Sequence, residues 1–100
     1  MNNIKEKLNN GKTVYRYKEG GNSMLPRLKS NQPVDLMPVN EDTLLKKHSI
    51  VFCKVNGRYV THLITGIKGK QYQISNNKGY VNGWVTRKSI FGLVVKIHTV

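Results

Sequence analysis

Acidic residues are missing from the second half of this chain. All five acids of the 100 residues lie at or before Asp42, and residues 43–100 carry ten Lys or Arg and no Asp or Glu. The formal net charge is +12. A surface with this bias either keeps a small protein soluble or attracts phosphates, acidic proteins or anionic lipid headgroups. Charge alone does not identify such a partner, because it gives no sequence-specific contact.

Cysteine and long apolar runs are also scarce. Cys53 is the single cysteine, which excludes an internal disulfide and a cysteine-based zinc site. No apolar run approaches the ~18 residues of a membrane span, and residues 1–10 lack the apolar stretch of a secretory signal. We therefore expect a soluble, cytoplasmic protein. His48 and His98 have no partners at metal-ligand spacing, so we expect no metal and no cofactor.

The length and the pattern of β-forming residues predict one β-rich domain covering residues 1–100. Residues 1–19 form an N-terminal extension and a first strand. Segment 2–10 is suited to one or two helical turns, and segment 40–47 to one. Strands are predicted at 13–18, 34–39, 49–55, 58–64, 70–75, 84–87 and 89–98, with a turn at 66–69 and a polar loop at 76–83. Many short strands predict a mainly β, mostly antiparallel, barrel-like sheet.

The strongest local signal is a hairpin over residues 49–64. Two β-rich runs flank Asn56-Gly57, which favours a two-residue hairpin turn. With this turn Val51 faces His62, Cys53 faces Val60 and Val55 faces Arg58. Alternation then places these side chains and Ile64 on one face, and Ile50, Phe52, Tyr59, Thr61 and Leu63 on the other. Both faces are largely apolar, so the hairpin is predicted to be central in the sheet.

Two residues in this context suit acyl-transfer chemistry. Ser23 lies in the run Gly21-Asn22-Ser23-Met24-Leu25-Pro26, where glycine permits unusual backbone angles and proline stiffens the exit. A serine hydroxyl needs a base to take its proton, and a buried neutral histidine such as His62 is suited to that task. Taken alone, a serine in Ser23's position is more often a loop residue, and a histidine on an apolar strand face, such as His62, is more often a satisfied core residue than a catalyst.

The serine run resembles the Gly-x-Ser-Met-x-Pro box of the LexA-repressor and signal-peptidase superfamily of serine peptidases. Ser49-Ile50-Val51-Phe52 stands where this family has Asp-Ile-Val. Val60-Thr61-His62 stands where the repressors and bacterial signal peptidases carry a catalytic lysine, and where the archaeal and endoplasmic-reticulum branch carries a histidine. Residues 90–95 resemble the closing Ile-x-Gly-x-Val-Val strand. The resemblance extends over about residues 20–95.

The resemblance implies a role for each matched residue. Ser23 would be the nucleophile and His62 the general base, acting on a polypeptide. The backbone N–H of Ser23 would meet the oxyanion, and Met24 would line the substrate pocket. The fold implied is the family's coiled, mostly antiparallel sheet. Because too few residues precede the box for a helix-turn-helix domain, we expect a stand-alone module of the kind that a phage or mobile element carries.

The chain departs from the family where acids support the histidine. The histidine branch has a Gly-Asp-Asn segment and a second Asp, whereas this chain has Asn76 and then Asn82 at the corresponding places. Replacing the orienting Asp of a serine-protease triad by Asn costs about 10⁴ in kcat. An Asn carbonyl can still accept the Nδ1 proton, so Asn76 or Asn82 is a candidate orienting residue. We therefore expect weak activity or none.

A second interpretation is a catalytically inactive member of this fold that binds nucleic acid or an acidic protein. Aromatic residues among Lys and Arg are typical of single-stranded nucleic-acid surfaces, where bases stack on rings. The candidate residues follow the predicted strand at 70–75, namely Lys78, Tyr80, Trp84, Arg87 and Lys88. The oligomeric state stays open.

Overall fold

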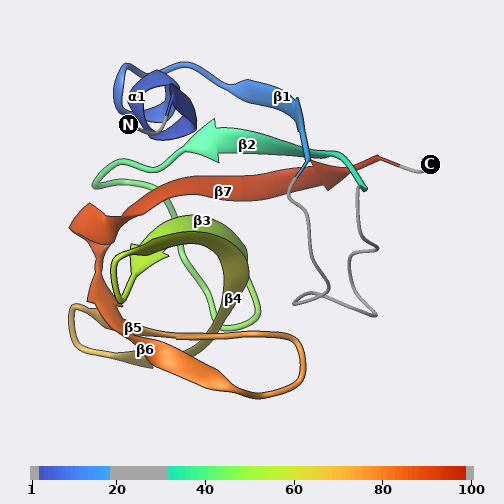
Figure 1. Ribbon diagram of the computed structural model, residues 1–100. Helices are drawn as coiled ribbons and strands as arrows, with labels where there is room; N and C mark the ends of the chain where they lie inside the picture. The colour runs from blue at the N-terminus through green and yellow to red at the C-terminus, as the bar shows by residue number, and fades with distance from the viewer. Residues whose placement is uncertain (1–2, 19–31, 99–100) are drawn as a thin grey trace.

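A single antiparallel sheet of seven strands dominates the computed structural model, which describes residues 3–18 and 32–98. The elements in chain order are α1 (Asn3–Asn9), β1 (Val14–Tyr17), β2 (Val34–Pro38), β3 (Ile50–Val55), β4 (Arg58–Lys68), β5 (Gln71–Ser75), β6 (Val81–Thr86), the 3₁₀ turn η1 (Arg87–Ser89) and β7 (Ile90–Ile97). The strand order β1-β2-β7-β3-β4-β5-β6 ends at two edges, so the sheet coils without closing into a barrel (Figure 1). The mainly β, antiparallel prediction is confirmed.

The central hairpin has the predicted register. Val51 pairs with His62, Cys53 with Val60 and Val55 with Arg58. Asn56 and Gly57 both have positive φ angles, 51° and 77°, as a type I′ turn requires. In the sheet order the hairpin lies between β7 and β5, which confirms its central place.

Apolar side chains fill both faces of the sheet. The helix-side core lies under α1 and consists of Leu8, Val14, Val34, Leu36, Phe52, Leu63 and Phe91. The coil core lies inside the curl of the sheet and consists of Leu45, Val51, Cys53, Val55, Ile64, Tyr72, Ile74 and Ile90. The hairpin divides between them as its alternation predicts, since odd-numbered β3 residues enter the coil core and Phe52 enters the other.

Helix α1 covers the helix-side core with one face. Ile4 and Leu8 are four residues apart, so they lie on the same side of the helix and both pack against this core. The helix ends at Asn9, and the chain leaves it at Gly11, whose φ of +78° is left-handed and whose N–H donates to the Leu8 carbonyl oxygen at 3.0 Å. The opposing Gly92 on β7 leaves room for the helix, because a Cβ there would lie 2.9 Å from Leu8 Cδ1.

Three local predictions are wrong. Strand β6 begins at Val81, inside the polar loop predicted at 76–83. The turn predicted at 66–69 begins later, because β4 continues to Lys68 and pairs there with Gln71. Gly66 serves close packing, since a Cβ on it would lie 3.2 Å from Gln73 Oε1 and 3.5 Å from the Trp84 ring. Segment 40–47 has no helix; Asn40 Oδ1 instead accepts a 2.8 Å hydrogen bond from the Asp42 N–H, a local bond that competes with helix formation.

Candidate functional site

His62 lies in the middle of β4, on the face that borders the coil core. It pairs with Val51, is followed by Leu63 and Ile64, and is only 5% exposed. The register shifts between Ile64 and Gly66 and between Ile74 and Ser75, which mark irregularities that bend a sheet. Through this coiling β6 comes back toward the tip of the hairpin, where Asn56 Nδ2 donates to the Asn82 carbonyl oxygen.

The environment of His62 favours a neutral imidazole. Burial lowers the pKa of His62 from its usual 6.5, and the side chain of Asn82 acts in the opposite direction by hydrogen bonding to the ring. His62 Nδ1 and Asn82 Oδ1 are both buried, and neither makes a hydrogen bond of normal distance and angle in the described part of the chain. A proton on Nδ1 that Asn82 Oδ1 accepted would satisfy both atoms and leave the lone pair of Nε2 free.

Of the two candidate orienting residues, the structure brings Asn82 to His62 and engages Asn76 elsewhere. The Asn76 Oδ1 accepts hydrogen bonds from the N–H groups of Lys78 at 2.9 Å and Tyr80 at 3.0 Å. These bonds shape the turn between β5 and β6, as Asx turns do. The carboxamide oxygen of Asn76 is therefore committed to the loop.

The buried imidazole predicts that stability depends on pH. Because the folded pKa of His62 lies below 6.5, the unfolded chain binds more protons between the two pKa values. The free energy of unfolding should therefore be undiminished at about pH 8 and fall as the pH drops below about 6.5. Urea titrations across this range should show a smaller fall for His62→Gln than for the wild type. Equal slopes for both proteins would contradict the assignment.

The remaining predicted site residues fall into two groups. Ser23 and Met24 lie outside the described residues. The five basic and aromatic candidates do not form one compact patch, because Lys78 and Tyr80 precede β6 whereas Arg87 and Lys88 follow it. The six-residue strand between them is about 20 Å long at ~3.3 Å per residue. Tyr80 is 69% and Trp84 45% exposed.

Arg87 has a structural role. Its Nη1 donates to the carbonyl oxygens of Asn40 at 2.9 Å and Thr43 at 2.7 Å, and its Nη2 donates to the Tyr72 hydroxyl at 3.0 Å. The guanidinium thereby ties the connection before β3 to β5 and η1. Sequence reasoning treated Arg87 as a surface cation and had no signal for these contacts, which join residues 15 to 47 positions apart.

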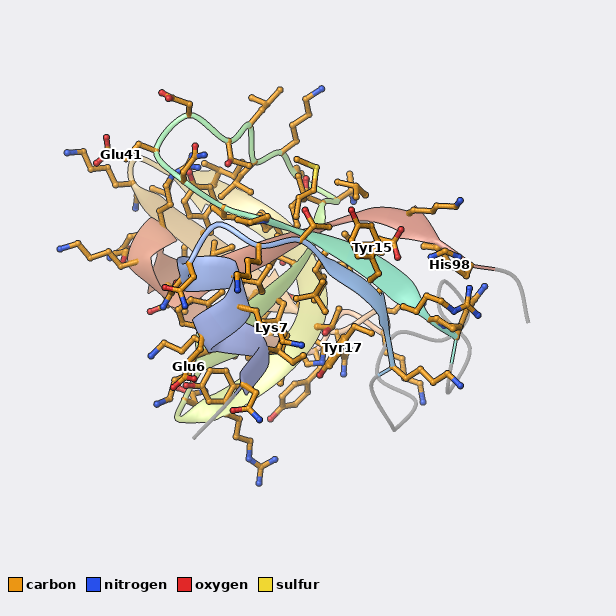
Figure 2. All side chains as sticks on the ribbon, turned by 90° about the horizontal axis from the view of Figure 1, so that it is seen from above. Glu6, Lys7, Tyr15, Tyr17, Glu41 and His98 are labelled. Carbon is orange, nitrogen blue, oxygen red and sulfur yellow. The ribbon has the colours of Figure 1, made fainter. Side chains whose placement is uncertain are left out.

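An acid does support a histidine in this structure, but the histidine is His98. Its Nε2 lies 2.7 Å from Asp35 Oδ1, and its Nδ1 lies 3.2 Å from Arg16 Nη1. Figure 2 labels the His98 side chain, near the C-terminal end of the described residues. Because arginine only donates, Nδ1 accepts and the ring proton is on Nε2, directed at the carboxylate. The Arg16 backbone N–H, followed by His98, lowers the pKa of Asp35. Sequence reasoning gave His98 no role, and nothing local signals a pair 63 residues apart.

Within the described ranges no three His, Cys, Asp or Glu side chains gather in a way that would hold a metal ion. Cys53 is fully buried in the coil core, so it is shielded from solvent. None of the helices in residues 3–18 and 32–98 is long and apolar enough to cross a membrane.

Comparisons with protein-family models, curated proteins and solved structures return no significant match.

Proposed function

We propose that the chain is a small serine-peptidase-like protein in which Ser23 is the nucleophile and His62 the general base. The substrate is a polypeptide, bound in extended form beside a strand. Activity is weak, because Asn82 rather than a carboxylate stands behind the histidine. The proposed setting is the cytoplasm of a cell or of a phage-infected host.

The state of His62 carries the proposal. A general base must be neutral at the working pH, and burial lowers the pKa of this imidazole while Asn82 stands at its Nδ1 side. A hydrogen bond from Nδ1–H to Asn82 would hold the imidazole ring in place and leave Nε2 as the nitrogen that accepts a proton. A histidine serving only to fill the coil core would not need a buried amide oxygen left for its ring.

In the proposed reaction Nε2 of His62 takes the hydroxyl proton of Ser23 as the oxygen bonds to the acyl carbon. The carbonyl electron pair moves to the oxyanion, which the Ser23 backbone N–H stabilises. The same proton then passes to the leaving amine, the C–N bond breaks, and water hydrolyses the acyl-enzyme by the reverse proton path.

A fluorophosphonate probe tests this proposal. The serine oxygen displaces fluoride from phosphorus only if a base activates it, so the wild type should be labelled at Ser23 slowly and with 1:1 stoichiometry. Ser23→Ala should abolish the label, and His62→Gln should slow labelling by about 10²-fold or more. His98→Gln is the matched control and should label at the wild-type rate. Labelling that persists in Ser23→Ala, or that depends on His98 instead of His62, contradicts the proposal.

The second candidate is a catalytically inactive protein that binds nucleic acid or an acidic protein. The exposure of Tyr80 and Trp84 on this basic chain favours it, because exposed rings among cations provide stacking surfaces. Binding of single-stranded DNA should then weaken steeply between low and moderate salt. If single-stranded DNA does not bind at low salt and the fluorophosphonate labels Ser23, the results favour the peptidase proposal.

A further inference from the structure

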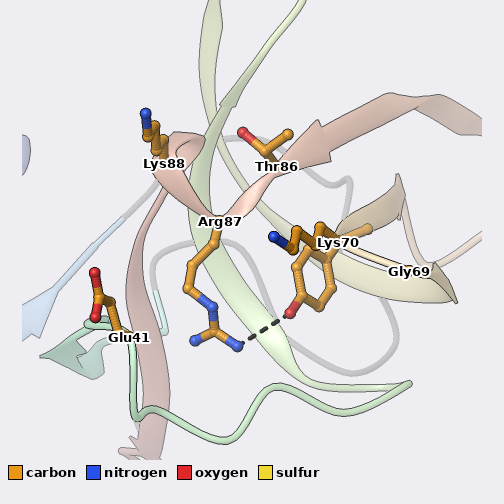
Figure 3. Close-up of a pocket in the computed structure, with 7 residues that line it drawn as sticks. Glu41, Gly69, Lys70, Thr86, Arg87 and Lys88 are labelled. Atoms are coloured by element: carbon orange, nitrogen blue, oxygen red, sulfur yellow. Dashed lines mark hydrogen bonds between the residues drawn. The ribbon is translucent and has the colours of Figure 1, made fainter.

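A cavity of about 530 Å³ opens at the end of the coil away from His62 (Figure 3). It forms where the β4–β5 turn, the end of β6, η1 and the segment after β2 meet. We call it the cationic pocket, and its polar lining consists of Glu41, Lys70, Tyr72, Thr86, Arg87 and Lys88. Tyr72 pairs with Ile67 on β4, five residues beyond His62, which is roughly 16 Å along the strand. The two sites are therefore separate.

Arg87 gives this pocket a fixed positive charge. Three of its five N–H groups are held by two carbonyl oxygens and the Tyr72 hydroxyl, and the guanidinium lies 5.8 Å from the centre of the Tyr72 ring. These partners are neutral, so they orient the cation without cancelling its charge. Among residues 3–18 and 32–98 no carboxylate forms an ion pair with Arg87.

Two lysines add to the charge of Arg87. Lys70 reaches across from the β4–β5 turn and Lys88 extends from η1, whereas Glu41 lies on the other side of Arg87 from Lys70 in Figure 3. Three cations against one acid leave the lining with a net charge of two positive units, which matches a phosphate dianion. The Thr86 hydroxyl is a further neutral hydrogen-bonding group of the lining.

We propose that the cationic pocket binds the phosphate group of a nucleotide-sized ligand. A guanidinium that is already oriented presents a planar fork to phosphate oxygens, and mobile lysines add charge around it. The volume is within the ~300–1,000 Å³ of small-molecule sites and leaves room for a base and sugar beside the Tyr72 ring. The phosphate belongs either to a free mononucleotide or to the end of a nucleic-acid strand. This function is independent of the Ser23 and His62 chemistry.

The experiment measures binding of four probes by calorimetry and by backbone amide NMR shifts. They are AMP, adenosine, and a short oligothymidylate with and without a 5′-phosphate. AMP should bind and shift the amides of residues 69–70 and 86–88, and adenosine should not bind. Lys70→Gln and Lys88→Gln should each weaken AMP about fivefold, and Glu41→Gln should tighten it by about twofold to fivefold. Arg87 is left intact because it supports the segment that contains Asn40 and Thr43.

Lys12→Gln is the matched control, since it removes the same charge from the segment between α1 and β1. These two elements lie on the far side of the molecule from β5 and β6 (Figure 1). It should leave AMP binding unchanged. Binding of AMP alone identifies a free nucleotide, and binding of only the 5′-phosphorylated strand identifies a strand end; both support the proposal. The proposal is overturned if no probe binds, if adenosine binds as tightly as AMP, or if Lys12→Gln weakens binding as much as Lys70→Gln does. The proposal is also overturned if the oligothymidylate binds with the same affinity with and without its 5′-phosphate and Lys70→Gln does not change that affinity.

Discussion

Asn82→Asp should raise the rate at which a fluorophosphonate labels Ser23 by about 10²-fold or more. The substituted carboxylate would stand where the Asn82 carboxamide now meets the imidazole, accept the Nδ1 proton and stabilise the imidazolium formed as Ser23 is deprotonated. The same charge raises the pKa of His62, because it favours the protonated ring. The labelling rate, which needs the neutral ring, should therefore begin to rise at a higher pH in Asn82→Asp than in the wild type.

Asn76→Asp provides the matched control for this prediction. It makes the same chemical change in the β5–β6 turn, where a carboxylate still accepts the N–H groups of Lys78 and Tyr80. Neither the labelling rate nor its pH dependence should change. A gain of similar size in both variants would indicate a general effect of added negative charge on this basic protein. No gain in folded Asn82→Asp would remove Asn82 from the proposed mechanism.

Phe52→Ala should reduce the free energy of unfolding by about 3–4 kcal/mol. Phe52 is fully buried at the centre of the helix-side core and meets three other aromatic rings. Its ring centroid lies 5.6 Å from that of Tyr17 in an edge-to-face pair and 5.8 Å from that of Tyr59 in a stacked pair. Truncation removes these contacts and leaves a cavity that the surrounding strands cannot close. For a domain of this size the melting temperature should fall by about 15 °C.

Tyr15→Ala is the control for this loss. Tyr15 belongs to the edge strand β1 and is 73% exposed, so its removal should change stability by less than about 0.5 kcal/mol. Urea unfolding followed by circular dichroism measures both variants. If Phe52→Ala is no less stable than Tyr15→Ala, the helix-side core does not hold the sheet in the way described.

The β3–β4 hairpin could be predicted to the residue because its determinants are local. Asn56 and Gly57 favour positive φ, which sets the turn, and a fixed turn sets every pair up to Val51 and His62. Alternation then assigned Phe52 to one core and Val51 to the other. The missed predictions had different causes. At Gly66 a distant partner decides, because Trp84 and Gln73 pack closely there instead of allowing a turn. Over residues 40–47 a local hydrogen bond from the Asp42 N–H to Asn40 Oδ1 competes with helix formation.

The candidate site was only partly accessible to the same reasoning. His62 and Asn82 were both named as candidates, but the sequence left Asn76 and Asn82 equivalent. The structure distinguishes them. The coiling of the sheet brings β6, with Asn82, back to the hairpin, whereas the Asn76 side chain is hydrogen-bonded within the β5–β6 turn. The carboxylate of Asp35 on β2 pairs with His98, which follows β7, and no local signal in the sequence indicates this pair.

By itself the sequence determined the strands, the hairpin register, the two apolar faces and the excess of positive charge, because these follow from residue type and from spacing within a few positions. Tertiary structure alone decided which amide meets His62, which histidine receives the carboxylate, and where Lys70, Arg87 and Lys88 surround a cavity. The physical reason is that these contacts depend on the twist and irregular register of the whole sheet, which accumulate over several strands.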